Sequence, residues 1–175
     1  EQIDLLTRKY YQYFVPKYLA KAQKVLTVSE FSKKDMVESL GISKDKINVV
    51  YTGANPLYKP LSDIEISETR ARFSQGNPYF LYVGSIKKKK NIPRLIRAFD
   101  IFKSRTQSPH KLLLAGRMAW QTGEVSETLK GLKNPDSVVF LGYTGMDVLP
   151  KIVGAAYALA YPSLFEGFGI PIIES

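Results

Sequence analysis

The chain has 175 residues, a net charge of +9 from 25 basic and 16 acidic side chains, and a hydrophobic fraction of 45%. This length fits one α/β domain with an appendage, and the composition excludes a disordered chain. The absence of cysteine excludes a disulfide scaffold and a zinc finger, whereas the charge attracts anions without choosing among nucleotides, nucleic acids and acidic lipids.

The first 52 residues are predicted to form two helices and two short strands. Apolar side chains recur at helical spacing within residues 1–24, and Pro16 should kink or split that helix. We expect a strand at Val25–Val28, a helix from Ser32 to Gly41 and a strand at Ile47–Tyr51. No segment of the chain has the length of apolar sequence that a membrane span requires, and no signal peptide is predicted at the start.

Residues 53–60 combine turn-forming side chains with no apolar period, which predicts an interdomain hinge. We therefore expect three parts: residues 1–52 from one domain, the hinge at 53–60, and a second domain at 61–175.

Strands and helices alternate four times after the hinge. The predicted strands are Tyr79–Val83, Lys111–Ala115, Val138–Leu141 and Tyr157–Tyr161. The predicted helices start at Asn91, near Glu124, at Thr144–Asp147 and near Ile170. Short continuous apolar strands are typical of strands buried on both faces, so the fold class is α/β with a doubly wound, Rossmann-like parallel sheet. Because Ser175 follows the start of the last helix by about one turn, we expect the natural polypeptide to continue.

Glycine or proline follows the predicted strands where ligands bind in open parallel sheets. The four dipeptides are Gly84-Ser85, Gly116-Arg117, Gly142-Tyr143 and Pro162-Ser163. Glycine lets a ligand approach the backbone closely, and tight strand-to-helix turns favour glycine as well.

The lysine run Lys87–Lys90 precedes a helix N-terminus, where free N–H groups and a lysine charge together suit a diphosphate. Four consecutive lysines cannot all point inward, so most of them should be solvated. A solvated run or a nucleic-acid patch is the alternative interpretation.

The segment Pro162–Glu174 carries the sharpest signal. Gly167 and Gly169 flank Phe168 at a predicted strand-to-helix turn, so several backbone N–H groups can face one ligand. Glu166 and Glu174 lie eight positions apart, and carboxylates suit sugar hydroxyls because each accepts two hydrogen bonds from a diol. A surface glutamate and a glutamate on a helix face would give the same spacing.

Other candidates are weak. His110 is the only histidine and lies in a polar loop, which favours a surface position over a catalytic one. Without cysteine and with one histidine, neither a metal site nor a catalytic triad is expected. Trp120 could be a lid or a packing residue, and the basic, aromatic helix at 1–24 could contact a membrane surface or pack against another domain.

In their order along the chain, these motifs resemble the family-4 glycosyltransferases (glycosyl transferases group 1). The matching segments are Val28–Asp35, Val49–Gly53, Tyr82–Ile86, Lys89–Asn91, Leu95–Phe99, Phe140–Tyr143 and Tyr161–Gly169, with Glu166 and Glu174 as the family's Glu-x7-Glu pair. Each segment alone is weak evidence for the family, whereas the whole set in this order is specific to it.

The resemblance implies a GT-B fold, a C-terminal domain that binds a nucleotide sugar, and transfer with retention of anomeric configuration and without a metal or cofactor. It implies that Lys90 contacts the donor diphosphate, helped by Lys89, that Glu166 holds donor-sugar hydroxyls, and that Glu174 binds the ribose. It implies donor contacts from the backbone of Gly167, Phe168, Gly169 and Ile170, and from turns at Gly84, Ser85, Gly116 and Tyr143.

Many members carry arginine where this chain has Ser85. A hydroxyl residue there, with a triplet such as Lys89-Lys90-Asn91, is typical of mannosyltransferase-like members, which favours GDP-mannose as donor. The acceptor is expected to be a glycan or a lipid-linked sugar bound by an N-terminal, acceptor-side domain, of which residues 1–52 are the end and most is missing from this chain. Cytoplasmic localisation, at or near the inner membrane face, and an inactive isolated chain are expected, with no nucleic-acid partner.

Two other functions are weighed against this one. A non-catalytic basic module would bind any anionic polymer or membrane surface in a salt-sensitive way, without nucleotide preference. A nicotinamide-dependent Rossmann enzyme is disfavoured, because the first turn lacks the G-x-G-x-x-G fingerprint.

Overall fold

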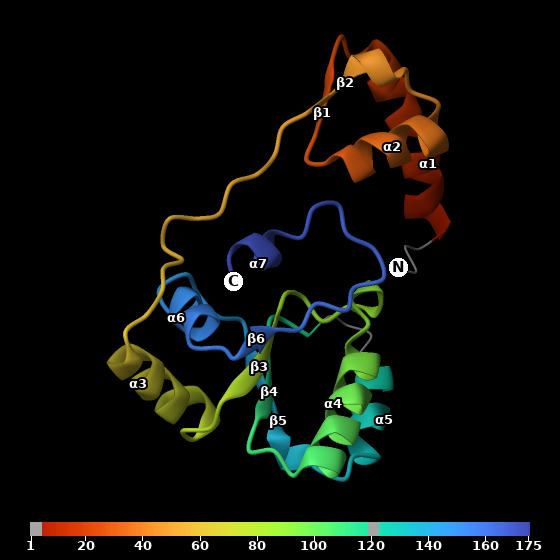
Figure 1. The fold of residues 1–175 in the computed structure, drawn as a ribbon. Helices are drawn as coiled ribbons and strands as arrows, with labels where there is room; N and C mark the ends of the chain where they lie inside the picture. Colours follow the sequence, from red (N-terminus) through yellow and green to blue (C-terminus); the bar gives the residue numbers. More distant parts are fainter. Residues whose placement is uncertain (1–4, 119–122) are drawn as a thin grey trace. The chain divides into compact units, whose positions relative to one another are not determined.

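The computed structural model describes residues 5–118 and 123–175. The chain divides into two compact units, one formed by Glu1–Gly53 with Glu166–Ile170 and the other by Ala54–Phe165 with Pro171–Ser175. Figure 1 labels the helices and strands of both units.

The first unit contains two parallel strands and two helices. Its elements are α1 (Leu5–Lys21), β1 (Val25–Thr27), α2 (Glu30–Leu40), a 3-10 turn at Lys44–Lys46, and β2 (Ile47–Val49). Val25 pairs with Ile47 in the parallel register, and both side chains are buried. Strand β1 is one residue shorter than predicted and β2 is two residues shorter, and Val28, Val50 and Tyr51 lie exposed beyond them.

Two local expectations in this unit were wrong. Pro16 does not split the first helix, which runs continuously from Leu5 to Lys21, and the alternative of a kink stays a prediction. The second helix begins at Glu30 rather than at Ser32, because the Ser29 side chain accepts a hydrogen bond from the Ser32 N–H and is the N-cap. Gly41 ends this helix as expected, in the left-handed conformation with φ 66°.

The second unit is built on a four-stranded parallel sheet in the order β5-β4-β3-β6. Its strands are β3 (Tyr79–Val83), β4 (Lys111–Ala115), β5 (Val138–Gly142) and β6 (Ala158–Leu159). Its helices are α3 (Asp63–Ser74), α4 (Ile92–Thr106), α5 (Gly123–Lys130), α6 (Leu149–Gly154) and α7 (Ile170–Ile173, which spans the boundary between units), with 3-10 turns at Lys88–Lys90 and Pro135–Ser137. The parallel, doubly wound sheet confirms the predicted fold class.

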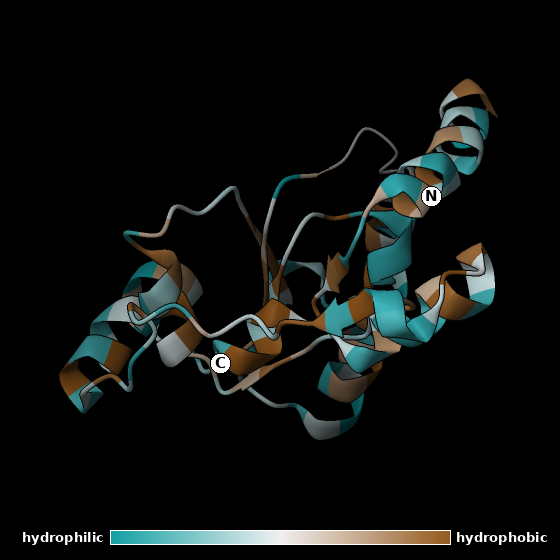
Figure 2. Ribbon diagram, turned by 90° about the horizontal axis from the view of Figure 1, so that it is seen from above, coloured by the Kyte–Doolittle hydropathy of each residue, from teal (hydrophilic) through white to brown (hydrophobic). Residues whose placement is uncertain are grey.

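Helices cover both faces of this sheet, with α4 and α5 on one and α3 and α6 on the other (Figure 1). Successive strand residues alternate between the faces: Tyr82 packs toward α4, whereas Leu81 packs toward α6. In Figure 2, hydrophobic and hydrophilic residues alternate along the helices, as expected for helices that bury one side.

Helix α3 has no counterpart in the sequence prediction. It is opened by a reciprocal capping box, in which Ser62 accepts from the Glu65 N–H and the Glu65 carboxylate accepts from the Ser62 N–H. Few of its residues are apolar, so its periodicity is weak. Helix α6 begins at Leu149 rather than at Thr144–Asp147, and β6 spans only Ala158–Leu159 of the predicted 157–161.

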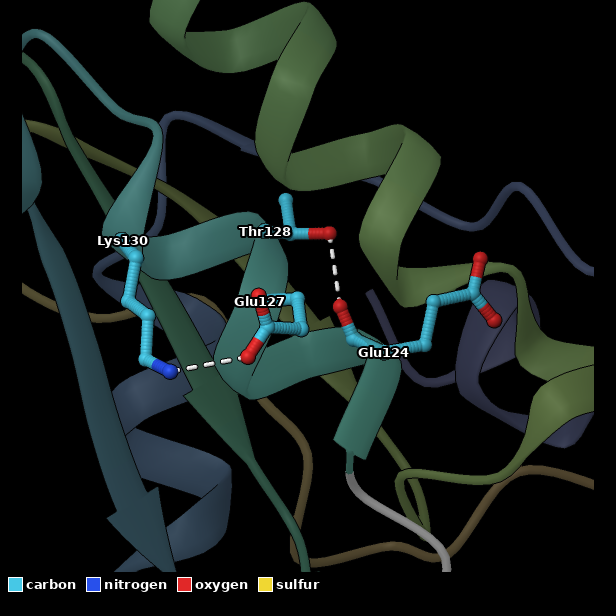
Figure 3. A network of polar contacts seen from close by, with 4 residues as sticks. All are labelled: Glu124, Glu127, Thr128 and Lys130. Atoms are coloured by element: carbon cyan, nitrogen blue, oxygen red, sulfur yellow. Dashed lines mark hydrogen bonds and ion pairs between the residues drawn. The ribbon is translucent and has the colours of Figure 1, made fainter.

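Helix α5 buries Val125 and carries polar contacts within its own turns, which Figure 3 shows. The Thr128 hydroxyl donates to the Glu124 carbonyl oxygen at 2.8 Å and accepts from an Arg97 N–H of α4 at 3.0 Å. Lys130 forms an exposed ion pair with Glu127 at 2.8 Å. The Arg97 contact therefore ties α5 to its neighbouring helix α4.

Candidate functional site

Loops that leave β3, β4 and β5 run side by side at the carboxyl-end edge of the sheet. The Gly84 N–H donates to the Ala115 carbonyl at 2.9 Å, and the Gly116 N–H donates to the Gly142 carbonyl at 2.7 Å. One step further, the Ile86 N–H donates to the Arg117 carbonyl at 2.9 Å. These bonds continue the sheet pattern past the strand ends and hold the loops in a fixed register.

Gly116 allows the two loop backbones to approach each other. Its φ is +153°, and a Cβ at this position would overlap the carbonyl oxygen of Gly84 and lie 2.6 Å from the carbonyl carbon. Gly84 itself has φ +142°. Among the glycines predicted from the strand ends, Gly116 is therefore required by close backbone packing, whereas a Cβ at Gly84 would meet the Tyr82 side chain and one at Gly142 would meet no atom within 4 Å.

A cavity of about 300 Å³ lies along these loops. Its lining comes from Val83, Gly84, Ser85, Ala115, Gly116, Arg117, Tyr143, Thr144 and Leu149. The Arg117 guanidinium lies over the Tyr143 ring, 4.5 Å from its centroid, at the cavity rim. A flat aromatic ring and a cation at the rim of a mostly apolar cavity suit a planar, anionic ligand such as a nucleotide.

Lys90 lies where the chain switches from one side of the sheet to the other. In a sheet ordered β5-β4-β3-β6, the loops after β3 and β6 leave neighbouring strands. The Lys90 ammonium lies 3.3 Å from the Tyr161 hydroxyl and 5.2 Å from the centroid of its ring. The Leu164 N–H donates to the Lys89 carbonyl at 2.8 Å. Ligands of doubly wound sheets bind at such a switch point.

The N-terminus of α4 faces this loop without a side-chain cap. Asn91 occupies the N-cap position with φ 59°, and its side-chain amide donates to the Pro162 carbonyl at 3.2 Å instead of capping the helix. Pro93 has no N–H to offer. The first-turn N–H groups of Ile92 and Arg94 therefore add a partial positive charge beside Lys90, which suits a phosphate group.

Glu174 lies in a different cavity of the second unit. That cavity, of about 410 Å³, shares no lining residue with the Gly84–Gly116 cavity. Burial, together with the charge of Glu174 and a hydrogen bond to it, raises the pKa of Tyr58 to about 12. Glu174 thus contacts a tyrosine that lies within the predicted hinge at 53–60.

The residues Glu166–Ile170 belong to the first unit. The Gly167 carbonyl accepts hydrogen bonds from the Ser32 hydroxyl at 3.2 Å and from the Ser29 hydroxyl. The Phe168 ring lies 6.1 Å from the Tyr51 ring. Gly169 is buried with φ 90°, so its backbone conformation favours glycine.

The structure therefore groups the predicted residues unevenly. Gly84, Ser85, Gly116 and Tyr143 line one cavity, and Lys89 and Lys90 lie on the adjoining loop after β3. Arg117 and Tyr161 were not predicted as site residues, although Arg117 belongs to the strand-end dipeptide Gly116-Arg117 and Tyr161 ends the predicted strand 157–161. Their signal was a cation after Gly116 and an aromatic ring at the end of the predicted last strand.

His110 lies at the opposite end of the sheet, immediately before β4. Its ring packs against Phe80, Phe102 and Tyr157, and its Nδ1 lies 2.6 Å from the Ser108 hydroxyl. Burial, with the nearby Arg70 and Lys103 charges, lowers the pKa of His110. The histidine is thus a packing residue remote from the loops of the candidate site.

The part of the chain that the structure describes contains neither a candidate metal cluster nor a helix that could span a membrane. Within residues 5–118 and 123–175, three or more His, Asp or Glu side chains nowhere gather in a way that could hold a metal ion. Of the helices in this described part, none has the length and apolarity to cross a membrane. Trp120, the candidate lid residue, lies outside the described residues.

Two curated mannosyltransferases resemble this chain over most of its length. The O-antigen chain mannosyltransferase B of Escherichia coli is 29% identical over 160 residues, covering 90% of this chain and 42% of that protein. The O-antigen chain mannosyltransferase RfbU of Salmonella typhimurium is 28% identical over 172 residues, covering 98% of this chain and 44% of that protein. The chain thus spans less than half the length of these relatives.

Solved structures share the fold. The Anabaena protein HepE, crystallised with UDP and glucose, matches with a TM-score of 0.78 at 22% identity, covering 98% of this chain and 48% of its own. WaaG, a glycosyltransferase involved in lipopolysaccharide biosynthesis, matches with a TM-score of 0.78 at 17% identity, over 99% of this chain and 49% of its own. These matches confirm the GT-B type of α/β fold.

Residues 63–175, which include all of the four-stranded sheet and its loops, match the family described as Glycosyl transferases group 1. The ordered motifs predicted the same family. The chain therefore belongs to the group 1 glycosyltransferases.

Proposed function

We propose that the whole protein moves a sugar from a nucleotide-sugar donor to a glycan or lipid-linked acceptor, with retention of anomeric configuration and without a metal or cofactor. The observation that carries the proposal is the placement of Lys90 and the uncapped α4 N-terminus at the switch point of the sheet. Family membership supports the same reaction class.

GDP-mannose is the proposed donor. The support comes from the names of relatives, since both O-antigen proteins are mannosyltransferases. The structure of HepE with UDP and glucose makes a uridine nucleotide the alternative. The cavity at Gly84 and Gly116 would border the base, with Tyr143 and Ser85 at its rim.

In the proposed transfer, the bond between the anomeric carbon and the diphosphate oxygen breaks. A new bond forms from the same carbon to the acceptor hydroxyl oxygen on the same face of the sugar, and the hydroxyl proton passes to the departing diphosphate or to water. Negative charge grows on the diphosphate, where Lys90, helped by Lys89, and the α4 N-terminus would stabilise it.

The remaining predicted residues receive donor-holding roles in this proposal. Glu166 would accept hydrogen bonds from donor-sugar hydroxyls, and the backbone of Gly167, Phe168, Gly169 and Ile170 would donate to the sugar and phosphate. Glu174 would accept from the ribose hydroxyls, for which it would have to exchange its Tyr58 contact for a ligand contact. The acceptor would be bound by parts of the protein outside this chain, at the cytoplasmic side of a membrane.

The first experiment replaces Lys90 with Ala in the full-length enzyme and measures turnover. Removal of one stabilising cation at the leaving group should lower kcat by about 10²–10³-fold. Lys88→Ala is the matched control, because Lys88 is an exposed lysine of the same turn. Equal turnover in the Lys90 variant and the parent enzyme would remove the proposed role, and the anomeric configuration of the product tests retention.

The second experiment titrates the chain with UDP, GDP and ADP sugars by calorimetry, with and without EDTA. Binding of GDP-mannose alone, unaffected by EDTA and lost in Glu174→Ala, is the expected result. Preference for a UDP sugar would replace the donor assignment. Binding to heparin or DNA without any nucleotide preference would favour the basic-module function instead.

A further inference from the structure

The positive charge of this chain is concentrated in one segment. Residues 87–106 contain eight basic side chains and one acidic side chain, so this segment alone carries +7 of the net +9. It comprises the lysine turn and α4, both in the second unit. Lys90 and Lys89 belong to the proposed donor site, and the arginines of α4 have no role in it.

The arginines of α4 form one exposed stripe. Its four side chains, all exposed, are Arg94, Arg97, Ile101 and Arg105. Because these positions follow the helical repeat, they share one side of α4 over a length of about 16 Å. The other side of the helix buries Ile92, Ile96 and Phe99 against the sheet. The stripe therefore faces outward on a helix that is firmly packed.

Neither Asp100 nor Glu127 forms an ion pair with these arginines. Asp100 is turned to the side, where it accepts hydrogen bonds from the Lys133 and Asn134 backbone N–H groups at 3.1 and 2.9 Å. On the neighbouring helix α5, Glu127 is paired with Lys130 (Figure 3). Among the described residues, the three arginines make no ion pair, and Arg97 donates to the Thr128 hydroxyl.

We propose that this stripe of α4 docks the protein on an anionic lipid membrane. Arginines in a row match the negative surface potential of acidic headgroups. Ile101, at the centre of the row and 51% exposed, provides an apolar group that can enter the boundary between headgroups and acyl chains. Single-stranded nucleic acid is bound with the help of stacking aromatic rings, and the exposed stripe contains none.

The test measures co-sedimentation of the purified chain with vesicles of equal parts phosphatidylglycerol and phosphatidylcholine, and of phosphatidylcholine alone. Binding only to the acidic vesicles, weakened by salt, is expected. Each basic residue near such a surface strengthens partitioning by about fivefold. The variant Arg94→Gln/Arg105→Gln, which keeps the Arg97 contact with Thr128, should therefore bind about 20–30-fold more weakly.

The matched control is Lys9→Gln/Lys21→Gln in α1, which removes the same charge from two exposed positions of another basic helix. An equal loss in this control would overturn the proposal, because binding would then follow net charge alone. Arg105→Gln by itself, at the end of α4 away from Lys90, should weaken vesicle binding about fivefold without changing donor binding. That variant separates failure of this proposal from failure of the proposed donor site.

Ile101→Ser distinguishes a membrane from an anionic polymer. We expect it to weaken vesicle binding severalfold and to leave heparin binding unchanged, since only a bilayer offers the isoleucine an apolar environment. Thermal melting of each variant checks the fold, and all substituted positions are exposed. Absence of binding to acidic vesicles, or an equal effect of Ile101→Ser on heparin and vesicles, would overturn the proposal.

Discussion

The two units of this chain use similar parallel strands with different degrees of burial. In the second unit, β4 has four buried residues among five, and β3 has three among five. In the first unit, β1 and β2 bury one residue each, Val25 and Ile47. The four-stranded sheet is covered by helices on both faces, whereas the described helix α1 has no buried residue.

This difference indicates which contacts hold the chain folded. Buried apolar area is the main stabilising contribution, and nearly all of the largest buried side chains lie on the four-stranded sheet and its helices. We therefore expect substitutions in the second unit to lower the free energy of unfolding more than comparable substitutions in the first. The predictions below test this ranking, beginning with the largest expected effect.

Gly116→Ala should be the most damaging of these substitutions. Its Cβ would overlap the backbone of Gly84, and alanine rarely adopts the φ of +153° found there. Neither backbone can move without breaking the hydrogen bonds that align the loops, so we expect a loss of about 3 kcal/mol or more. Urea denaturation measures it, with Gly123→Ala as control, because a Cβ at Gly123 meets no atom within 4 Å. Equal stabilities of the two variants would contradict the close approach.

Tyr79→Phe tests the attachment of α6 to the sheet. The fully buried Tyr79 hydroxyl donates to the Ile152 carbonyl at 2.6 Å, and burial raises the pKa of Tyr79. Without the hydroxyl, the carbonyl oxygen loses a partner in an apolar environment, which should cost about 2 kcal/mol. Tyr157→Phe, at an exposed tyrosine, should cost much less. A melting temperature unchanged in Tyr79→Phe would show that the hydrogen bond contributes little.

The same contrast in burial explains which strands and helices the sequence pattern predicts correctly. The central strands β3 and β4 match their predicted bounds, because residues buried on both faces must form a continuous apolar run. At the sheet edge, β6 is shorter than its apolar run, since only Phe80 and Leu81 of β3 pair with it. Helix α3 was missed because a capping box and a few apolar side chains define it, rather than a full apolar stripe.

The candidate site shows a similar limit. The positions of Gly84 and Gly116 follow from strand ends, because the carboxyl ends of parallel strands meet at one edge. The contact between Arg117 and Tyr143 depends on the order of the strands in the sheet. The residues around Arg117 and those around Tyr143 do not determine that order. The contact of Glu174 with Tyr58 joins positions more than a hundred residues apart, so no spacing rule could predict it.

Asp100 should make the folding stability of the second unit depend on pH. Burial opposes its ionisation, but hydrogen bonds from Asn134 and the Lys133 N–H outweigh it and lower the pKa of the carboxyl. A lowered folded-state pKa stabilises the fold above the ordinary value of 3.8, and this stability is lost as pH falls through the folded value. Asp100→Asn should cost about 1–1.5 kcal/mol at pH 7 and progressively less below about pH 4. Urea midpoints across pH measure the effect, with Asp136→Asn as the control for a lost surface carboxylate. A pH-independent difference would contradict the assignment.

Ser29→Ala should have the smallest effect on the molecule and the most local one. Its hydroxyl caps α2 through the Ser32 N–H at 3.0 Å and also donates to the Gly167 carbonyl, so its loss should destabilise this region by about 1 kcal/mol. If the two units differ in stability as their burial indicates, hydrogen exchange should quicken at the α2 amides while the β4 amides keep their protection. Ser39→Ala is the control, because that hydroxyl donates only to the exposed Asp35 side chain. Equal acceleration in α2 and β4 would mean that the two units unfold together, and the ranking by local burial would then be wrong.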